Sequence, residues 1–192
     1  MQYRRLWVGL TLVVALSFAT LAYFGREIYR KAPPIPAVVT ETGRQLFTAQ
    51  EIRDGQNVWQ SLGGQEVGTI WGHGAYVAPD WSADWLHREA LALLDIYAQE
   101  KGAENFESLS LEEQAGLKQR LKAEMRANTF DPATGRLTVS ENRAKAIELV
   151  AAHYTSLFGD DPEFAELRKA YAIPANSIKT PERQHLLNAF FF

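Results

Sequence analysis

An uncharged stretch of 20 residues, "LWVGLTLVVALSFATLAYFG", lies between Arg5 and Arg26 and constrains the chain more than any other feature. As a helix rising about 1.5 Å per residue, it is long enough to cross the roughly 30 Å hydrocarbon layer of a bilayer. Trp7 and Tyr23 stand near its ends, where aromatic side chains favour the membrane–water interface. Because the apolar core of a cleaved signal peptide is shorter, about 7–15 residues, we predict that residues 1–31 form an uncleaved membrane anchor.

The charges that flank this stretch bear on its orientation. Arg4 and Arg5 favour a cytoplasmic amino terminus, but three further basic residues follow the stretch before position 32. The positive-inside rule therefore gives only a weak bias toward an extracytoplasmic location for the rest of the chain.

A proline-rich segment, "KAPPIPAVVTETG", follows the anchor. Three of the four residues from Pro33 to Pro36 are proline, which forbids a helix and favours a stiff, extended spacer. We therefore expect residues 32–43 to be a linker and residues 44–180 to be a folded domain.

The domain carries mainly helical signals. Thr48 and Glu51 form a capping-box pattern, and the helix that it opens places Trp59 and Gly55 on one face. A glycine on an apolar face allows close approach of another backbone. By the same capping and periodicity signals, further helices are expected near Asp84–Gly102, from Ser110, from Ser140 to Gly159, and from Asp161.

Two segments differ from the helical pattern of the rest of the domain. "NTFDPATGRLTVS" has turn residues between short apolar runs and predicts a small β-hairpin, so the expected fold class is mainly α with one hairpin. Residues 181–192 end in "HLLNAFFF", which is increasingly apolar. Either this helix folds back on the domain, or it begins a second membrane helix; we favour the second, because a terminal run of phenylalanines is an exposed apolar end in water.

Composition excludes several classes of function. The chain has no cysteine, so it forms no disulfide, thiolate metal site or covalent c-type haem attachment. Its net charge of −3 gives no electrostatic support for a nucleic-acid partner. The four histidines make no HxxxH or HExxH pattern that would indicate zinc.

The stretch "SLGGQEVGTIWGHGAYVAPDWSADW", Ser61 to Trp85, combines many glycines with large aromatic residues. Such a backbone serves a close approach to a cofactor, an ion or another backbone, or it is a surface loop whose tryptophans anchor it to the core. His73 lies between two glycines and is a candidate ligand, although a lone histidine is more often a polar loop residue. Asp80 and Asp84 flank Trp81, and capping of the following helix explains them.

The sequence "DGQNVWQSLGGQEVGTIWGHGAYVAPDWSADWLHRE", Asp54 to Glu89, resembles the N-terminal extracytoplasmic region of quinol-dependent nitric oxide reductases, which are single-chain members of the haem-copper oxidase superfamily. The resemblance extends over essentially the whole chain, with "ERQHLLNAFFF" similar to the start of that family's second membrane helix. It implies a cytochrome-c-like helical domain on the periplasmic or extracellular side of the inner (cytoplasmic) membrane. It also implies reduction of two NO to N2O and water with electrons from quinol.

The resemblance also implies which metals and haems this chain would hold and which would lie in the catalytic membrane helices. In the related cytochrome subunits a haem-binding Cys-x-x-Cys-His precedes a Gly-x-Gly-Ala-Tyr turn; here Gly64–Gly68 replaces the haem motif, and the turn is Gly72–Tyr76. The backbone carbonyls of Gly74 and Tyr76 match those that bind an interfacial calcium ion. Haem b, haem b3 and the non-haem iron, with their ligands, are expected in the catalytic membrane helices of the same or a partner chain.

Two hypotheses follow from these observations. Trp59, Trp71, Trp81 and Trp85 are hypothesised to fill the volume that a porphyrin would occupy, with ordinary core packing as the alternative. The competing function is a membrane-anchored extracytoplasmic sensor or binding module with no enzyme attached. The sequence leaves the oligomeric state open.

Overall fold

The structure is a computed structural model that describes residues 2–192, and it separates into two compact units with their boundary between Pro34 and Ile35. The first unit is one helix, α1 (Gln2–Arg30). Its segment Tyr3–Arg30 has a mean hydropathy of 1.9, and among the described residues it is the one helix long and apolar enough to cross a membrane. The predicted anchor helix is therefore present as a single helix, and none of the apolar window in Tyr3–Arg30 is buried.

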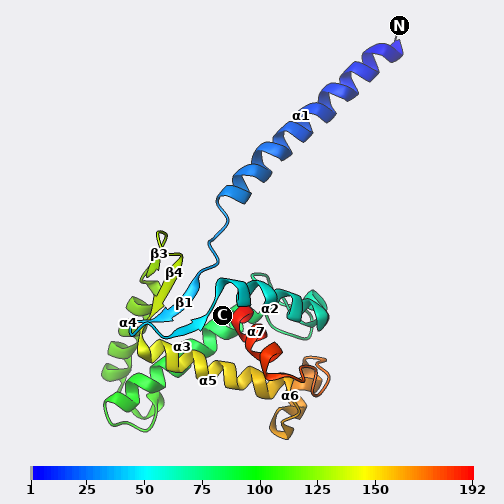
Figure 1. Ribbon diagram of the computed structural model, residues 1–192. Helices are drawn as coiled ribbons and strands as arrows, with labels where there is room; N and C mark the ends of the chain where they lie inside the picture. The colour runs from blue at the N-terminus through cyan, green and yellow to red at the C-terminus, as the bar shows by residue number, and fades with distance from the viewer. Residues whose placement is uncertain (1) are drawn as a thin grey trace. The chain divides into compact units, whose positions relative to one another are not determined.

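The second unit is mainly helical, as predicted. Its helices are α2 (Ala49–Ser61), α3 (Trp81–Glu100), α4 (Leu111–Arg126), α5 (Glu141–Phe158), α6 (Ala165–Ala170) and α7 (Pro181–Phe191). Three single turns of 3-10 helix connect them: η1 (Gly64–Val67), η2 (Phe106–Ser108) and η3 (Pro162–Phe164). The helices α3 and α5 lie side by side, and α7 packs against α2 (Figure 1).

The helix starts follow the capping residues that the sequence predicts. The hydroxyl of Thr48 accepts a hydrogen bond from the Glu51 N–H at 3.0 Å, and the Glu51 carboxylate accepts one from the Thr48 N–H at 2.7 Å. This reciprocal arrangement satisfies two backbone donors that the first turn of a helix leaves free. Ser110, Ser140 and Thr180 cap α4, α5 and α7 through their hydroxyl oxygens, and at Ser110 the Glu113 carboxylate completes the reciprocal pair.

A four-stranded sheet, in the order β2-β1-β4-β3, lies beside the helices. Its strands are β1 (Ala37–Thr40), β2 (Gln45–Phe47), β3 (Phe130–Asp131) and β4 (Arg136–Val139). The antiparallel pair β3–β4 is the predicted hairpin, with Gly135 at φ +68° in its turn. The other two strands are additions that the sequence pattern does not predict.

Strand β1 corrects the expected extent of the linker. Residues 32–43 are predicted to be an extended spacer, but Ala37–Thr40 pairs in parallel with Arg136–Val139 and belongs to the domain. The reason is local. Pro36 is the last proline of the proline-rich segment, so each residue after it in that segment has a backbone N–H group that can pair with another strand. Val38 is moreover β-branched and fully buried, which suits a strand in the core.

The C-terminal helix α7 belongs to the core of this domain. Leu187, Ala189 and Phe191 are each only 1% exposed, and the helix lies along α2. Burial against α2 thus accounts for the apolar character of "HLLNAFFF", as expected if this helix folds back on the domain. A continuation of this helix into a second membrane span stays a prediction.

Gly55 is what lets α7 approach α2 so closely. A Cβ atom at this position would lie 2.0 Å from the backbone oxygen of Leu186 and 2.7 Å from the Cβ of Phe190. Backbone atoms cannot move aside cheaply, so the close contact requires glycine. The sequence-based expectation of a close backbone approach at Gly55 is confirmed.

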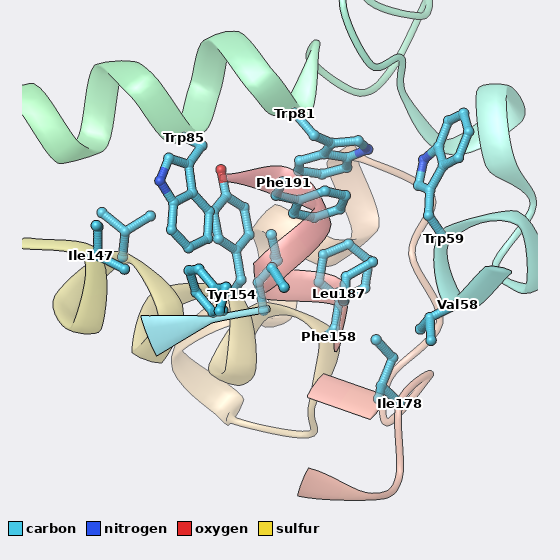
Figure 2. Close-up of a cluster of buried hydrophobic side chains, with 14 of the residues drawn as sticks. Val58, Trp59, Trp81, Trp85, Ile147, Tyr154, Phe158, Ile178, Leu187 and Phe191 are labelled. Carbon is cyan, nitrogen blue, oxygen red and sulfur yellow. The ribbon is translucent and has the colours of Figure 1, made fainter. Parts of the chain in front are cut away.

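Stacked aromatic rings form the centre of the main core. Trp81 stacks on Phe191 with ring centroids 5.3 Å apart, and Trp85 stacks on Tyr154 at 5.4 Å, as Figure 2 shows. Trp59 is also buried and lies near Phe190. A second, smaller cluster joins α3 to α4, and it includes Leu93, Tyr97, Phe106 and Leu117.

One tryptophan does not belong to this core. The hypothesis that Trp59, Trp71, Trp81 and Trp85 together fill a volume is wrong for Trp71, which is 89% exposed. Trp71 lies in the glycine-rich segment with φ +53°, an uncommon conformation for a residue other than glycine, and it does not belong to the main core cluster. For Trp59, Trp81 and Trp85, which are buried, replacement of a porphyrin stays a hypothesis beside ordinary core packing.

Replacement of Gly55 by alanine tests the α2–α7 contact. We expect Gly55→Ala to destabilise the chain by about 1–3 kcal/mol, because the added methyl group overpacks against backbone. Gly116→Ala in α4 is the matched control: a Cβ there meets nothing within 4 Å. It should stabilise the chain by up to about 1 kcal/mol through helix propensity. Thermal unfolding in detergent, followed by near-UV circular dichroism, measures both; a stabilised Gly55→Ala variant would contradict the close contact.

Candidate functional site

The segment between α2 and α3, residues 62–80, is the candidate site and is called here the glycine loop. Apart from the turn η1, it has no regular helix or strand, and only one isolated β-bridge, between Thr69 and Asp80. Gly68 and Gly74 have φ of +104° and +83°, conformations that side-chain-bearing residues rarely adopt. The loop therefore depends on its glycines for its backbone path.

Asp80 holds the two ends of the glycine loop together. As the N-cap of α3, its carboxylate accepts a hydrogen bond from the Ala83 N–H at 3.0 Å. The same carboxylate accepts from the Thr69 hydroxyl at 2.7 Å and from the Gly72 N–H at 2.5 Å. Burial disfavours its charged form, but the bonds from Gly72, Thr69 and Ala83 together prevail and lower the pKa of Asp80.

Thr69 extends this bracing across the loop. Its hydroxyl oxygen accepts a hydrogen bond from the Gly74 N–H at 2.9 Å while the hydroxyl donates to Asp80. Its backbone oxygen accepts from the Trp81 N–H at 2.8 Å, and its own N–H donates to the Pro79 oxygen at 3.2 Å. The turn that contains Gly74 is thus fixed through Thr69 to the start of α3.

Trp81 connects the glycine loop to the core. Its indole N–H donates to the Val67 backbone oxygen at 2.7 Å, while its ring lies fully buried. A Cβ atom at Gly68 would lie 2.4 Å from the Trp81 Nε1 atom, so the backbone passes directly against the ring. Close approach and a positive φ both require glycine here.

The two residues predicted to hold calcium lie at the open side of the loop. Gly74 and Tyr76 line a shallow hollow together with Gln65 and Glu66. Within residues 2–192, the backbone oxygens of Gly74 and Tyr76 accept no hydrogen bond from the protein. Carbonyl and carboxylate oxygens are the donors that a hard cation such as calcium prefers, so the chemistry of this hollow fits the ion.

The histidines do not gather into a site. His73 is exposed in the loop, and His87, His153 and His185 lie on α3, α5 and α7. Among the residues that the structure describes, no group of three or more His, Cys, Asp or Glu side chains is placed to hold a metal ion. His73 therefore belongs to no such group in the described residues, and the carbonyl oxygens remain the candidate donors.

Buried charges fix α3, the helix that the loop feeds into. Glu89 is 1% exposed and accepts from the Arg143 Nε at 2.5 Å and from the Trp85 indole N–H at 3.2 Å. Burial raises the pKa of Glu89, although Arg143 opposes that change. Near the start of the helix, Asp84 accepts from the Tyr154 hydroxyl at 2.6 Å and pairs with the Arg88 guanidinium at 2.7 Å.

The bracing residues Thr69 and Asp80 are not identifiable as site residues from the sequence patterns used above. The interpretation of Asp80 as a helix cap is confirmed, but its bonds to Thr69 and Gly72 follow no helical or strand spacing. The sequence signal that could have identified Asp80 is a carboxylate that lies just after a glycine-rich stretch and just before a helix.

Replacement of Asp80 by asparagine tests the bracing. Because the pKa of Asp80 is lowered on folding, its stabilising effect is complete above the unfolded aspartate pKa, about 3.9, and is lost as pH falls below it. We expect Asp80→Asn to cost on the order of 1 kcal/mol at pH 7 and less at pH 3. Amide hydrogen exchange at Gly72 and Gly74 should also accelerate.

Asp131→Asn, in the hairpin turn, is the control for this measurement. Asp131 also accepts local hydrogen bonds that lower its pKa, but these come from its own turn and not from the glycine loop. Its replacement should leave exchange at Gly72 and Gly74 unchanged. Equal exchange at Gly72 in wild type and Asp80→Asn would show that Asp80 does not brace the loop.

Comparison with known proteins identifies the family of the second structural unit. The family of NorB cytochrome c-like domains, which belong to nitric oxide reductases, matches residues 36–192, nearly all of the second structural unit. A search of curated proteins gives no match. Since the family match covers well over half of the chain, the chain belongs to the NorB cytochrome c-like domain family of nitric oxide reductases.

Proposed function

We propose that this chain is the N-terminal part of a quinol-dependent nitric oxide reductase, which converts two NO to N2O and water. The observation that carries the proposal is the family match over residues 36–192, in a domain that has no cysteine and follows an apolar helix. Without cysteine the domain cannot attach a c-type haem covalently, so it does not relay electrons as a cytochrome c. A quinol dissolved in the membrane supplies two electrons and two protons, which balance the reaction.

The catalytic groups belong to a different part of the enzyme in this proposal. Haem b, haem b3 and the non-haem iron, with their histidine ligands, would reside in membrane helices of the same or a partner chain. The second unit described here would cover the outer face of those helices, on the periplasmic or extracellular side of the inner (cytoplasmic) membrane. The chain would then contribute shape and electrostatics rather than catalytic side chains.

The closed aromatic core supports a cytochrome-c-like domain that needs no haem to fold. Trp81, Trp85 and Phe191 are almost completely buried and pack ring against ring with Tyr154. An apolar cluster of this size is stabilised by area removed from water, at roughly 25 cal/mol per Å². These rings would take the volume that a porphyrin occupies in a cytochrome.

The glycine loop is the part of the chain that would meet the catalytic helices. The backbone oxygens of Gly74 and Tyr76 would be calcium ligands, with Thr69 and Asp80 holding their turn in place. A bound calcium ion would compensate the negative charge of haem propionates at that boundary. Further ligands would come from the catalytic helices.

One experiment on the complete enzyme tests both the function and the loop. NO consumption per haem is measured with a reduced quinol as electron donor, and calcium content is determined on the same samples. We expect wild type to consume NO, and Gly74→Val to be much slower and poorer in calcium. A β-branched residue at φ +83° is strained by about 1–3 kcal/mol and shifts the turn.

Gly135→Val is the matched control, because Gly135 also has a positive φ, +68°, but lies in the hairpin turn. Its local strain should be similar, and its turnover and calcium content should stay near those of wild type. Absence of quinol-driven NO consumption in wild type would overturn the proposed function and favour an anchored sensor or binding module. Unchanged turnover and calcium in Gly74→Val would overturn only the role of the loop.

A further inference from the structure

Tyr154 of α5 lies in a line of tryptophan and tyrosine rings that touch one another. Its ring stacks on Trp85 with centroids 5.4 Å apart and meets the Trp81 ring edge-on at 6.0 Å (Figure 2). Trp81 in turn meets the Tyr171 ring edge-on at 5.9 Å. Tryptophan and tyrosine give up a single electron more readily than most other side chains, and rings in contact exchange electrons rapidly. The line is therefore a short path for an electron between Tyr154 and Tyr171.

The two ends of this path differ in their exposure to solvent. Tyr154 is 1% exposed and Trp81 is fully buried. Tyr171 follows directly after α6 and is only half-buried. A dissolved oxidant can thus meet the ring of Tyr171 but not that of Tyr154, and Trp81 connects the two.

The hydroxyl group of Tyr154 has a proton acceptor. It donates to the Asp84 carboxylate at 2.6 Å, and the Arg88 guanidinium pairs with the same carboxylate at 2.7 Å. Burial raises the pKa of Tyr154, so its side chain is a neutral phenol at pH 7. Loss of an electron alone would leave a cation in the apolar core, which is unfavourable. A carboxylate within hydrogen-bond distance can take the phenol proton at the same time.

Apolar packing alone does not require this combination. Phenylalanine fills a core without a hydroxyl group that needs a partner. The other fully buried tyrosine, Tyr97, also donates to a carboxylate, that of Glu124, but its ring faces the Arg120 guanidinium instead of a tryptophan. Tyr154 has both a proton acceptor and a path for the electron.

We propose that Tyr154 is a redox-active tyrosine, which a strong one-electron oxidant at the surface, such as nitrogen dioxide or a high-valent metal complex, converts to a neutral tyrosyl radical. One electron passes from the Tyr154 ring through Trp81 and Tyr171 to the oxidant, which is reduced by one electron. The O–H bond of Tyr154 breaks, and its proton forms an O–H bond with a carboxylate oxygen of Asp84. This activity is independent of the proposed function, because all of its groups lie in the second structural unit.

Photochemical oxidation of the 192-residue chain in detergent tests the assignment, and the chain has no cysteine to compete for the oxidant. A laser flash on tris(bipyridine)ruthenium(II), with a cobalt(III) ammine as electron acceptor, generates the ruthenium(III) oxidant, and EPR spectroscopy follows tyrosyl radicals. Radicals on exposed tyrosines such as Tyr76 decay by coupling to one another. We expect an additional signal in wild type that lives several-fold longer. Tyr154→Phe should remove it, and Tyr97→Phe, the matched control, should retain it.

Further measurements distinguish the electron path from a structural effect. Asp84→Asn removes the ionised acceptor and should lower the yield of the long-lived radical several-fold. Trp81→Phe keeps a ring but interrupts the path, so the radical should form more slowly, whereas Trp85→Phe, on the other face of the tyrosine, should not slow it. Near-UV circular dichroism verifies that each variant is folded.

Formation of the radical in wild type should also be slower in heavy water, because the proton leaves together with the electron. An equal rate in heavy and ordinary water would contradict proton transfer to Asp84 without recourse to any variant. A long-lived signal of equal size in Tyr154→Phe, or none in wild type, would overturn the proposal.

Discussion

The position of Trp81 at the start of α3 is the constraint on which the rest of the domain depends. Its ring stacks on Phe191 of the C-terminal helix and also contacts Tyr154 and Phe158 of α5 edge-on or tilted. Its indole N–H holds the Val67 oxygen, and the residue before it, Asp80, braces the glycine loop. The two adjacent residues Asp80 and Trp81 thus join the core, the helix start and the loop.

This dependence explains why the domain can present a strained, glycine-rich turn on its surface. Ala78 of the loop is buried and Leu62, Val67 and Ile70 pack partly against the core, but the turn from Trp71 to Val77 has no such packing, and unpacked turns are marginal in water. The order of the turn comes from the hydrogen bonds of Thr69 and Asp80. Asp80 is the N-cap of α3, and buried aromatic residues and the Glu89–Arg143 ion pair hold that helix in place. Backbone oxygens of the turn are therefore presented by a supported structure, as the proposed calcium site would require.

Sequence predicts the local features of this domain and misses the contacts between distant segments. The caps at Thr48, Ser110 and Ser140 are predictable because each depends on residues within one turn. Strand β1 is not, because it pairs with residues about a hundred positions later, and no short-range pattern records that pairing. The exposure of Trp71 is equally hidden, because composition does not show which way a ring points at a positive φ.

The coupling between core and loop through Trp81 is the central claim, and amide hydrogen exchange of Trp81→Phe tests it most directly. Phenylalanine retains a ring that can stack on Phe191 but has no N–H for the Val67 oxygen. Trp85→Phe removes the same atoms from the core without touching the loop. Exchange at Trp71, Gly72 and Gly74 should accelerate in Trp81→Phe and remain near wild type in Trp85→Phe. Equal protection of these amides in the two variants would contradict the claim.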